Sequence, residues 1–396
     1  MILVDPPNAS GHGRLWSHLA SDTSYDELHA FARGLGVPER GFDRDHYDVP
    51  AEWYDRVVAA GALPVSSREL ARRLVRAGLR RRKAERLGPR PPGRALVRPD
   101  RLRRGDVVAV VAPSGPVDPG RLARGLARLR SWGLEVRSPV EPEPSLAHLA
   151  GPDVVRAREL TAAWTDPEVR AVIATRGGYG AHRIADLLDW DELAEAGPKL
   201  LVGFSDLTAL HQAFAARLGL VTVHGPVAAS LADRDGETLE ALRALLVEGE
   251  CPPLTGLEVG VGGRAEGVLS GGNLAVLAAG VGTPVAGSAS GGIVVLEDVG
   301  ERPYRLDRAL TQLLRSGWFE GVRGVVCGEF VDCGPPAEVR AVLADRLGSL
   351  RVPLVYDAPV GHGLTNRALP FGVRALLDAT GPTATLTVDE PLRPGR

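Results

Sequence analysis

The sequence predicts an α/β protein: a small N-terminal α/β domain, a doubly wound parallel-sheet domain and a second, β-rich α/β domain. Its 396 residues, of which 44% are hydrophobic and 24% charged, are enough for more than one core. From Gly105 onward, short apolar runs alternate with amphipathic stretches, as in a parallel sheet covered by helices. A Pro- and Gly-rich segment, Gly88-Pro-Arg-Pro-Pro-Gly93, precedes this pattern and indicates a linker.

These changes of pattern divide the chain into five segments. We expect a small α/β domain at residues 1–87, a linker at 88–100, a parallel-sheet domain at 101–230, an interdomain connection at 231–262 and a C-terminal domain at 263–390.

Local signals predict the first elements. Strands are expected at Ile2–Val4 and Leu63–Val65, and helices at Tyr25–Arg33 and Ala51–Ala60. Two motifs typical of helix starts support this prediction. Asp48 precedes Pro50 at an early helical position, and Ser66 with Glu69 has the spacing of a capping box.

The N-terminal segment is also rich in side chains that bind metals. Six of them could supply ligands or a phosphoesterase site: Asp5, His12, His18, Asp45, His46 and Asp48. No pair has a diagnostic ligand spacing, so the sequence assigns no metal and no organic cofactor. The segment resembles a short bacterial domain family of unknown function.

Charge and cysteine usage limit the partners and the compartment. The formal net charge of −2 argues against a globally basic nucleic-acid binder, although residues 72–86 form an arginine-rich run. We interpret that run as a solvated helix and expect no nucleic-acid partner. Three cysteines without a C-x-x-C pair suit a reducing compartment. Without a signal peptide or a membrane span, we expect a cytoplasmic protein.

The remaining elements follow from apolar runs and helical periodicity. Strands are predicted at Val107–Ala112, Ala171–Thr175, Lys199–Gly203, Gly267–Ser270, Ile293–Leu296, Val322–Cys327 and Val352–Tyr356. Helices are predicted at Pro119–Trp132, Val154–Trp164 and Asp206–Leu218.

Ser205 stands where an apolar strand runs directly into a helix. A serine on such a turn projects its hydroxyl from the carboxyl edge of the sheet, and the following N–H groups can stabilise an oxyanion. The motif is not G-x-S-x-G, because Asp206 and Leu207 follow the serine. On motif shape alone, the simpler interpretation is that Ser205 caps the helix and Asp206 complements its dipole.

A glycine-rich loop, Arg176-Gly-Gly-Tyr-Gly180, follows the preceding strand at the same edge of the sheet. Such a loop can bring N–H groups close to a substrate atom, although an ordinary turn or a phosphate loop is the alternative. The spacings of a P-loop and of a dinucleotide fingerprint are both absent.

A serine nucleophile needs a base and an acid that orients it. Two apolar segments deliver such groups: Ile293–Leu296 is followed by Glu297 and Asp298, and Val355–Gly361 by His362. Taken alone, the acids suit a solvated loop and the histidine a structural role. Glu301 is a second acid close by.

Seven motifs in order carry a family resemblance. They are Gly105-Asp-Val-Val-Ala-Val-Val-Ala-Pro-Ser-Gly115, Arg176-Gly-Gly-Tyr-Gly180, Gly203-Phe-Ser-Asp-Leu-Thr-Ala-Leu210, His224-Gly-Pro226, Gly271-Gly-Asn-Leu274, Leu296-Glu-Asp-Val-Gly-Glu-Arg-Pro-Tyr-Arg305 and Gly361-His362. Together, across about residues 101–385, they resemble the LD-carboxypeptidase family, which includes murein tetrapeptide carboxypeptidases and microcin-immunity peptidases.

The resemblance implies a role for each matching residue. Ser205 would be the nucleophile, His362 the general base and Glu297 the acid that orients it, with Glu301 as the competing acid. The N–H groups of Gly177 or Gly178 and of Asp206 would form the oxyanion hole. Candidate substrate-binding side chains are His224, Arg302 and Arg305.

Three functions are compatible with this assignment. The first is cytoplasmic hydrolysis of the amide between an L-centre, such as meso-diaminopimelate, and a terminal D-alanine in recycled murein peptides, without a cofactor. The second is a microcin-immunity-like amidase that acts on peptide-nucleotide conjugates. The third is a regulatory protein that binds muropeptides or nucleic acid. A homodimer is the expected assembly.

Overall fold

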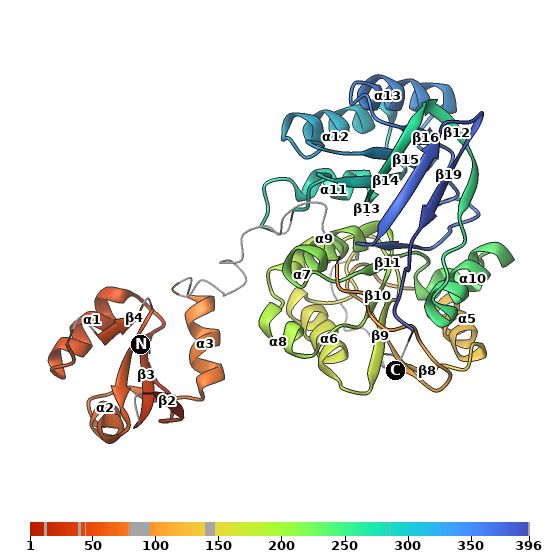
Figure 1. Ribbon diagram of the computed structural model, residues 1–396. Coiled ribbons are helices and arrows are strands. Elements are labelled where there is room, and N and C mark those ends of the chain that lie inside the picture. The colour runs from red at the N-terminus through yellow and green to blue at the C-terminus, as the bar shows by residue number, and fades with distance from the viewer. Residues whose placement is uncertain are drawn as a thin grey trace. The chain divides into compact units, whose positions relative to one another are not determined.

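A computed structural model describes residues 1–11, 14–38, 41–43, 45–77, 79, 96–138, 147–284 and 286–394. The chain forms two compact units, Met1–Gly88 and Pro89–Arg396 (Figure 1). Of the predicted linker, residues 88–95 lie outside the described residues. So do His12 and residues 80–86 of the arginine-rich run.

The N-terminal unit is a mixed sheet in the order β4-β5-β3-β1-β6, with β2 paired to β3. Its elements are β1 (Ile2–Val4), β2 (Ala9–Gly11), β3 (Arg14–Ser21), α1 (Tyr25–Gly34), β4 (Phe42–Asp43), β5 (His46–Pro50), the 3₁₀ turn η2 (Ala51–Trp53), α2 (Tyr54–Ala59), β6 (Leu63–Pro64) and α3 (Ser67–Arg76). One face of the sheet packs into a core that includes Leu19, Leu28, Tyr47 and Val49.

Local signals succeeded at α3 and failed at β5. The amide of Glu69 donates to Ser66 Oγ at 3.1 Å, as the capping-box spacing predicted. Asp48, however, lies inside strand β5 and does not start a helix. Tyr47 and Val49 on either side of it are fully buried, so burial of alternate residues extends the strand through Asp48 to Pro50. Asp48 therefore does not cap a helix, although the helix predicted at Ala51–Ala60 is present as η2 and α2.

The first part of the C-terminal unit, here called its first layer, is built on a sheet with the strand order β17-β11-β10-β9-β7-β8. All its strands are parallel except β17. The strands are β7 (Val107–Val111), β8 (Glu135–Arg137), β9 (Val169–Ala174), β10 (Leu200–Gly203), β11 (Thr222–His224) and β17 (Leu369–Phe371). Because β17 comes from the far end of the sequence, the C-terminal part of the chain completes this sheet.

Helices cover both faces of this sheet. Figure 1 shows α6 (Asp153–Thr165), α7 (Ala181–Ala185), α8 (Trp190–Glu195) and α9 (Thr208–Arg217) on one face, and α5 (Pro119–Ser131) and α10 (Gly236–Arg243) on the other. Short turns lie between them: η3 (Ser205–Leu207), η4 (Ala228–Ala232) and η5 (Ala244–Glu248).

The second layer is a closed barrel in the order β12-β16-β15-β14-β13-β18-β19. Its strands are β12 (Leu254–Val261), β13 (Gly263–Asn273), β14 (Gly292–Val299), β15 (Gly324–Val331), β16 (Leu354–Tyr356), β18 (Arg374–Ala379) and β19 (Thr383–Val388). Helices α11 (Leu274–Gly280), α12 (Pro303–Arg315) and α13 (Pro336–Gly348) pack on its outside (Figure 1). The predicted combination of a parallel sheet and a β-rich second domain is confirmed.

Within the described residues, the helices are too short or too polar to cross a lipid bilayer.

Candidate active site

Ser205 occupies a strained turn at the end of β10. Its φ is +63°, in the left-handed region that a non-glycine residue seldom adopts. Such strain is typical of a nucleophile held on a sharp strand-to-helix turn. The hydroxyl does not cap the helix, because η3 and α9 both begin without a side-chain capping bond. The helix-cap interpretation of Ser205 is therefore wrong.

The glycine-rich loop packs directly on this turn. A Cβ at position 177 would lie 2.9 Å from Ser205 Cβ and 3.0 Å from its Oγ, so only glycine fits there without displacement. The loop is tied to the turn by Asp206, whose Oδ2 accepts a hydrogen bond from the amide of Ala181 at 2.8 Å. The backbone of Gly177 thus lies beside the Ser205 hydroxyl.

His362 lies against a buried carboxylate. Its Nδ1 is 2.6 Å from Oε2 of Glu297, a side chain on β14 with no solvent exposure. Gly361 permits this approach, since its φ is +122° and a Cβ there would lie 2.9 Å from the same oxygen. Glu301 instead lies beyond the strand and forms an ion pair with Arg305 at 3.4 Å. Of the two acids, Glu297 is the one that contacts His362.

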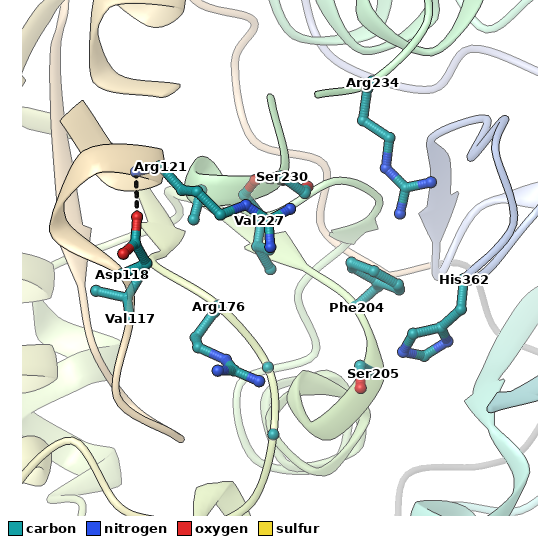
Figure 2. Close-up of a pocket in the computed structure, with 13 residues that line it drawn as sticks. Val117, Asp118, Arg121, Arg176, Phe204, Ser205, Val227, Ser230, Arg234 and His362 are labelled. Atoms are coloured by element: carbon teal, nitrogen blue, oxygen red, sulfur yellow. Dashed lines mark hydrogen bonds between the residues drawn. The ribbon is translucent and has the colours of Figure 1, made fainter. Parts of the chain in front are cut away.

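Ser205 and His362 line one pocket of about 290 Å³. Figure 2 shows their side chains next to each other, with the ring of Phe204 beside them. The lining consists of Val117, Asp118, Arg121, Arg176, Gly177, Gly178, Phe204, Ser205, Val227, Ala229, Ser230, Arg234 and His362. Residues from both layers of the C-terminal unit therefore meet at this pocket.

The three candidate substrate-binding side chains are not among these lining residues. His224 is fully buried and stacks on Phe371, with ring centroids 5.0 Å apart; its ring also lies 6.1 Å from that of the pocket residue Phe204. Burial, together with His211 and His362 nearby, holds the pKa of His224 well below its ordinary value. Arg302 precedes α12 at the surface, and Arg305 bonds Glu301 and the Tyr304 hydroxyl.

The pocket contains cationic side chains that the sequence did not single out. Arg121, Arg176 and Arg234 line it, and Arg234 is the most enclosed. Its guanidinium donates to the carbonyl oxygen of Leu364 at 3.2 Å, and burial lowers its pKa. Figure 2 shows it pointing toward Phe204 and His362. With arginine supplying nearly all the positive charge of this chain, composition gave no signal for these three.

His211 supports the nucleophile strand from behind. It is buried, and its ring nitrogens lie 2.8 Å from the Gly203 carbonyl oxygen and 2.9 Å from Thr222 Oγ1. Burial lowers the pKa of His211 to about 4, so the ring is neutral at pH 7. A neutral ring can donate from one nitrogen and accept at the other, as this position requires.

In the described part of the C-terminal unit, no three ligating side chains converge as a metal site would require. The cysteines at positions 251, 327 and 333 are free, and the last two are buried. The pocket itself contains the Ser205 hydroxyl and the His362 imidazole.

Three family models match three separate stretches of the chain. Residues 108–225 match the N-terminal domain of LD-carboxypeptidases, and residues 266–377 match the C-terminal domain. Residues 2–77 match a family described only as a protein of unknown function (DUF4031).

Relatives cover the C-terminal unit. A Streptomyces coelicolor protein whose carboxypeptidase name is provisional is 53% identical over 305 residues, which is 75% of this chain and 98% of its own length. The murein tetrapeptide carboxypeptidase of Pseudomonas aeruginosa is 37% identical over 292 residues, covering 68% of this chain and 92% of that protein.

Solved structures share the fold. The muramoyltetrapeptide carboxypeptidase of Oxalobacter formigenes has a TM-score of 0.65 at 32% identity, covering 72% of this chain and all of that one. The microcin C7 self-immunity protein MccF, solved with aspartyl sulfamoyl adenosine, has a TM-score of 0.68 at 22% identity and covers 75% of this chain and 100% of its own; this is a likeness of fold.

The two-layer fold and the serine-histidine pocket define a serine peptidase of carboxypeptidase type. The chain belongs to the LD-carboxypeptidase family.

Proposed function

We propose that the protein hydrolyses the amide between an L-configured centre, such as meso-diaminopimelate, and a terminal D-alanine in murein peptides. The observation that carries this proposal is His362, which lines the pocket with Ser205 and bonds the buried Glu297 at 2.6 Å. The murein peptide activities named for the relatives above support the choice of substrate.

Ser205 would act as the nucleophile. As its Oγ bonds the carbonyl carbon of the scissile amide, its proton passes to Nε2 of His362, the nitrogen on the ring edge opposite Glu297. His362 then gives this proton to the nitrogen of the departing D-alanine, and the C–N bond breaks. A water molecule, deprotonated by His362, attacks the resulting ester and restores the Ser205 hydroxyl.

Backbone N–H groups would stabilise the oxyanion formed in both steps. Gly177 and Gly178 line the pocket beside the serine, and Asp206 follows it in the chain. Such donors are already in position before the reaction, which is why they lower the barrier. The bond between Asp206 and the Ala181 amide would hold loop and turn together during the reaction.

Glu297 would orient the imidazole and stabilise its positive charge. Its Oε2 meets Nδ1 of His362, which fixes the proton on that nitrogen and leaves Nε2 as the base. Because the carboxylate has no solvent exposure, little water competes for this bond.

Arg234 would bind the terminal carboxylate of the substrate. A carboxypeptidase must recognise this group, and a guanidinium binds it through two parallel hydrogen bonds. Arg234 points into the pocket and is more enclosed than Arg121 and Arg176. We replace the predicted Arg302 and Arg305 with Arg234 in this role.

The test is release of D-alanine from a murein tetrapeptide by the purified protein. A tetrapeptide that ends in L-alanine is the stereochemical control, and the Ser205→Ala protein controls for contaminating peptidases. We expect release from the first substrate only. No release by folded protein at any pH between 6 and 9 would remove this substrate class.

A second candidate substrate is a peptide-nucleotide conjugate, and one observation favours it. The ring of Tyr179 is 50% exposed next to Gly178 and could stack on a nucleobase. Competition between the tetrapeptide and an aminoacyl sulfamoyl adenosine separates the two. Tighter binding of the conjugate, lost in Tyr179→Ala, would establish the second function.

The remaining expectations stay proposals. We place the protein in the cytoplasm, where recycled murein peptides would reach it, and expect a homodimer. The regulatory hypothesis, in which the N-terminal unit recognises nucleic acid or a partner and the hydrolase fold senses muropeptides without turnover, also stays a proposal. In the described part of the arginine-rich run at residues 72–86, Arg72 and Arg73 form ion pairs with Glu69.

A further inference from the structure

The N-terminal unit carries a cluster of imidazole and carboxylate groups on one face of its sheet. Strands β3 and β5 are antiparallel, and their register places His18 directly opposite Asp48. His46 precedes Asp48 by two residues on β5, so it projects from the same face. Leu19, Tyr47 and Val49 point to the opposite face, where they are buried.

The three side chains converge. His46 Nε2 lies 3.3 Å from Asp48 Oδ1, and His18 Nε2 lies 3.9 Å from the same oxygen. One ligand atom from each residue lies within 4.8 Å of those of the other two. A Zn²⁺ ion about 2.1 Å from each ligand in tetrahedral geometry would hold the ligands roughly 3.4 Å apart. The cluster needs only small side-chain movements to reach that spacing.

Both imidazoles are held by a second carboxylate. His18 Nδ1 lies 2.8 Å from Asp5 Oδ2, and His46 Nδ1 lies 2.6 Å from Asp45 Oδ1. Asp5 also accepts from the backbone amide of His18 at 2.6 Å, so its position is fixed twice. Each carboxylate keeps a proton on Nδ1 and directs Nε2 toward Asp48. Histidines that bind metals in proteins usually have this arrangement.

The orienting carboxylates are more deeply buried than the three candidate ligands, as expected for a metal site that is open to solvent. The orienting carboxylates are inside, with Asp5 1% and Asp45 7% exposed, whereas His46 is 13%, His18 30% and Asp48 47% exposed. Helix α3 covers the neighbouring part of this face, where Ala20 packs with Leu70 and Leu74. An ion could therefore enter from solvent and keep a coordination position open.

We propose that His18, His46 and Asp48 bind a divalent first-row transition-metal ion such as Zn²⁺, with Asp5 and Asp45 orienting the two histidines. Two imidazole nitrogens and one carboxylate oxygen suit such an ion better than Mg²⁺ or Ca²⁺, which prefer ligand sets made of oxygen. This site lies outside the peptidase machinery, and its test does not depend on the proposed peptidase activity.

Equilibrium dialysis of the full chain, free of any histidine tag and stripped with a chelator, measures bound Zn²⁺ directly. We expect one Zn²⁺ per chain, undiminished by a tenfold excess of Mg²⁺. His46→Gln and Asp48→Asn should each weaken binding by about 100-fold or more. Asp5→Asn, which removes only an orienting group, should weaken it by 10- to 100-fold.

Two matched controls come from the same chain. His148→Gln removes an exposed histidine of the C-terminal unit, and Asp55→Asn removes an exposed acid of α2; both should bind Zn²⁺ as the unaltered protein does. Co²⁺ provides a second readout, because its visible absorption reports imidazole ligation and should be lost in His46→Gln.

A folding defect is distinguished from ligand loss by thermal unfolding without metal. The half-exposed Asp48 makes Asp48→Asn the variant least able to disturb the fold, and Zn²⁺ should raise the unfolding temperature of the unaltered protein but not of this variant. Equal Zn²⁺ binding by Asp48→Asn, His46→Gln and both controls would overturn the proposal. Substoichiometric binding by the unaltered chain, or displacement by Mg²⁺, would overturn it as well.

Discussion

Each of the two units contains a histidine whose Nδ1 bonds a carboxylate, but the groups around the two histidines differ. In the C-terminal unit, Glu297 bonds Nδ1 of His362, and the ring lines a pocket with a serine hydroxyl. In the N-terminal unit, Asp5 bonds Nδ1 of His18, and the ring faces Asp48 and a second imidazole. The carboxylate does the same work in both: it fixes the tautomer and directs Nε2. The partner of Nε2 then determines the proposed chemistry of each site. In the C-terminal unit the partner is a serine hydroxyl to be deprotonated, and in the N-terminal unit it is a metal ion to be bound.

The two sites also differ in how the chain builds them. The candidate peptidase residues Ser205, Glu297 and His362 come from three different strands or strand ends, and the glycines at positions 177 and 361 permit close backbone approach. The N-terminal cluster needs no such loops, since the register of two neighbouring strands brings it together. Small changes in a loop should therefore damage the first site, whereas removal of a ligand should damage the second.

The largest expected effect is loss of the nucleophile or its base. Ser205→Ala and His362→Ala should each lower kcat for D-alanine release by a factor on the order of 10⁴ or more, because an unactivated hydroxyl is a poor nucleophile. The double variant should be scarcely worse than either single one, since both groups act in one step. Additive losses would show that His362 is not the base for Ser205. The comparison of the two carboxylate-histidine pairs would then fail.

Removal of the orienting carboxylate should cost somewhat less. Glu297→Gln should lower kcat by about 10³- to 10⁴-fold, because the imidazole keeps its basic nitrogen but loses its orientation and its charge partner. Glu301→Gln is the matched control, because Glu301 bonds Arg305 and not His362. Full activity in the first variant with loss in the second would identify Glu301 as the acid.

Gly177→Ala tests the close approach of the glycine-rich loop. A methyl group there would contact Ser205 Oγ and Cβ within about 3 Å. We expect kcat to fall by about 100-fold, since displacements near 1 Å at a reacting group cost that much. The free energy of unfolding should fall by about 1–3 kcal/mol, because the loop or the Ser205 turn must shift. Gly236→Ala, where no atom lies within 4 Å of the added Cβ, should retain full activity.

Arg234→Ala should raise KM for the tetrapeptide by about 10- to 100-fold with a smaller effect on kcat, as expected for a group that binds the terminal carboxylate. Arg234→Lys should recover part of this loss, because the charge returns without the two-pronged geometry. Steady-state kinetics separate the two constants. If Arg305→Ala gave the larger rise in KM, Arg305 would be the carboxylate-binding residue after all.

His211 provides the smallest effect at neutral pH and a contrast to both sites, since no carboxylate contacts it and burial keeps it neutral. Its folded pKa of about 4 lies below the ordinary value of 6.5. Its contribution to stability is therefore fully present above pH 6.5 and lost as the pH falls toward 4. The loss should be about 3 kcal/mol. Urea unfolding at pH 7.5 and 4.5 measures most of this loss. The free energy of unfolding should fall by about 2.5 kcal/mol more in the unaltered protein than in His211→Gln. Equal decreases would place a charged imidazole at this position.

In the C-terminal unit, the sequence alone predicted most strands and the candidate site residues, because the signals for both are local. Buried parallel strands leave apolar runs, and each candidate group follows one: Ser205 comes directly after β10, and His362 follows β16. The resemblance to LD-carboxypeptidases then selected among them. Only the structure separated Glu297 from Glu301: Glu297 lies within the buried strand β14, which ends before Glu301.

Tertiary structure decided what depends on contacts between distant residues. His224 belongs to a sequence motif, yet it is buried against Phe371 and does not line the pocket. Arg234 lies in a segment predicted only as a connection, and it reaches the pocket because the two layers close around it. The local sequence around Asp48 is typical of a helix start. Strand pairing instead places Asp48 in β5, opposite His18, thirty residues earlier in the chain. Composition and spacing report what each segment prefers alone, whereas the register between strands depends on the burial of both partners at once.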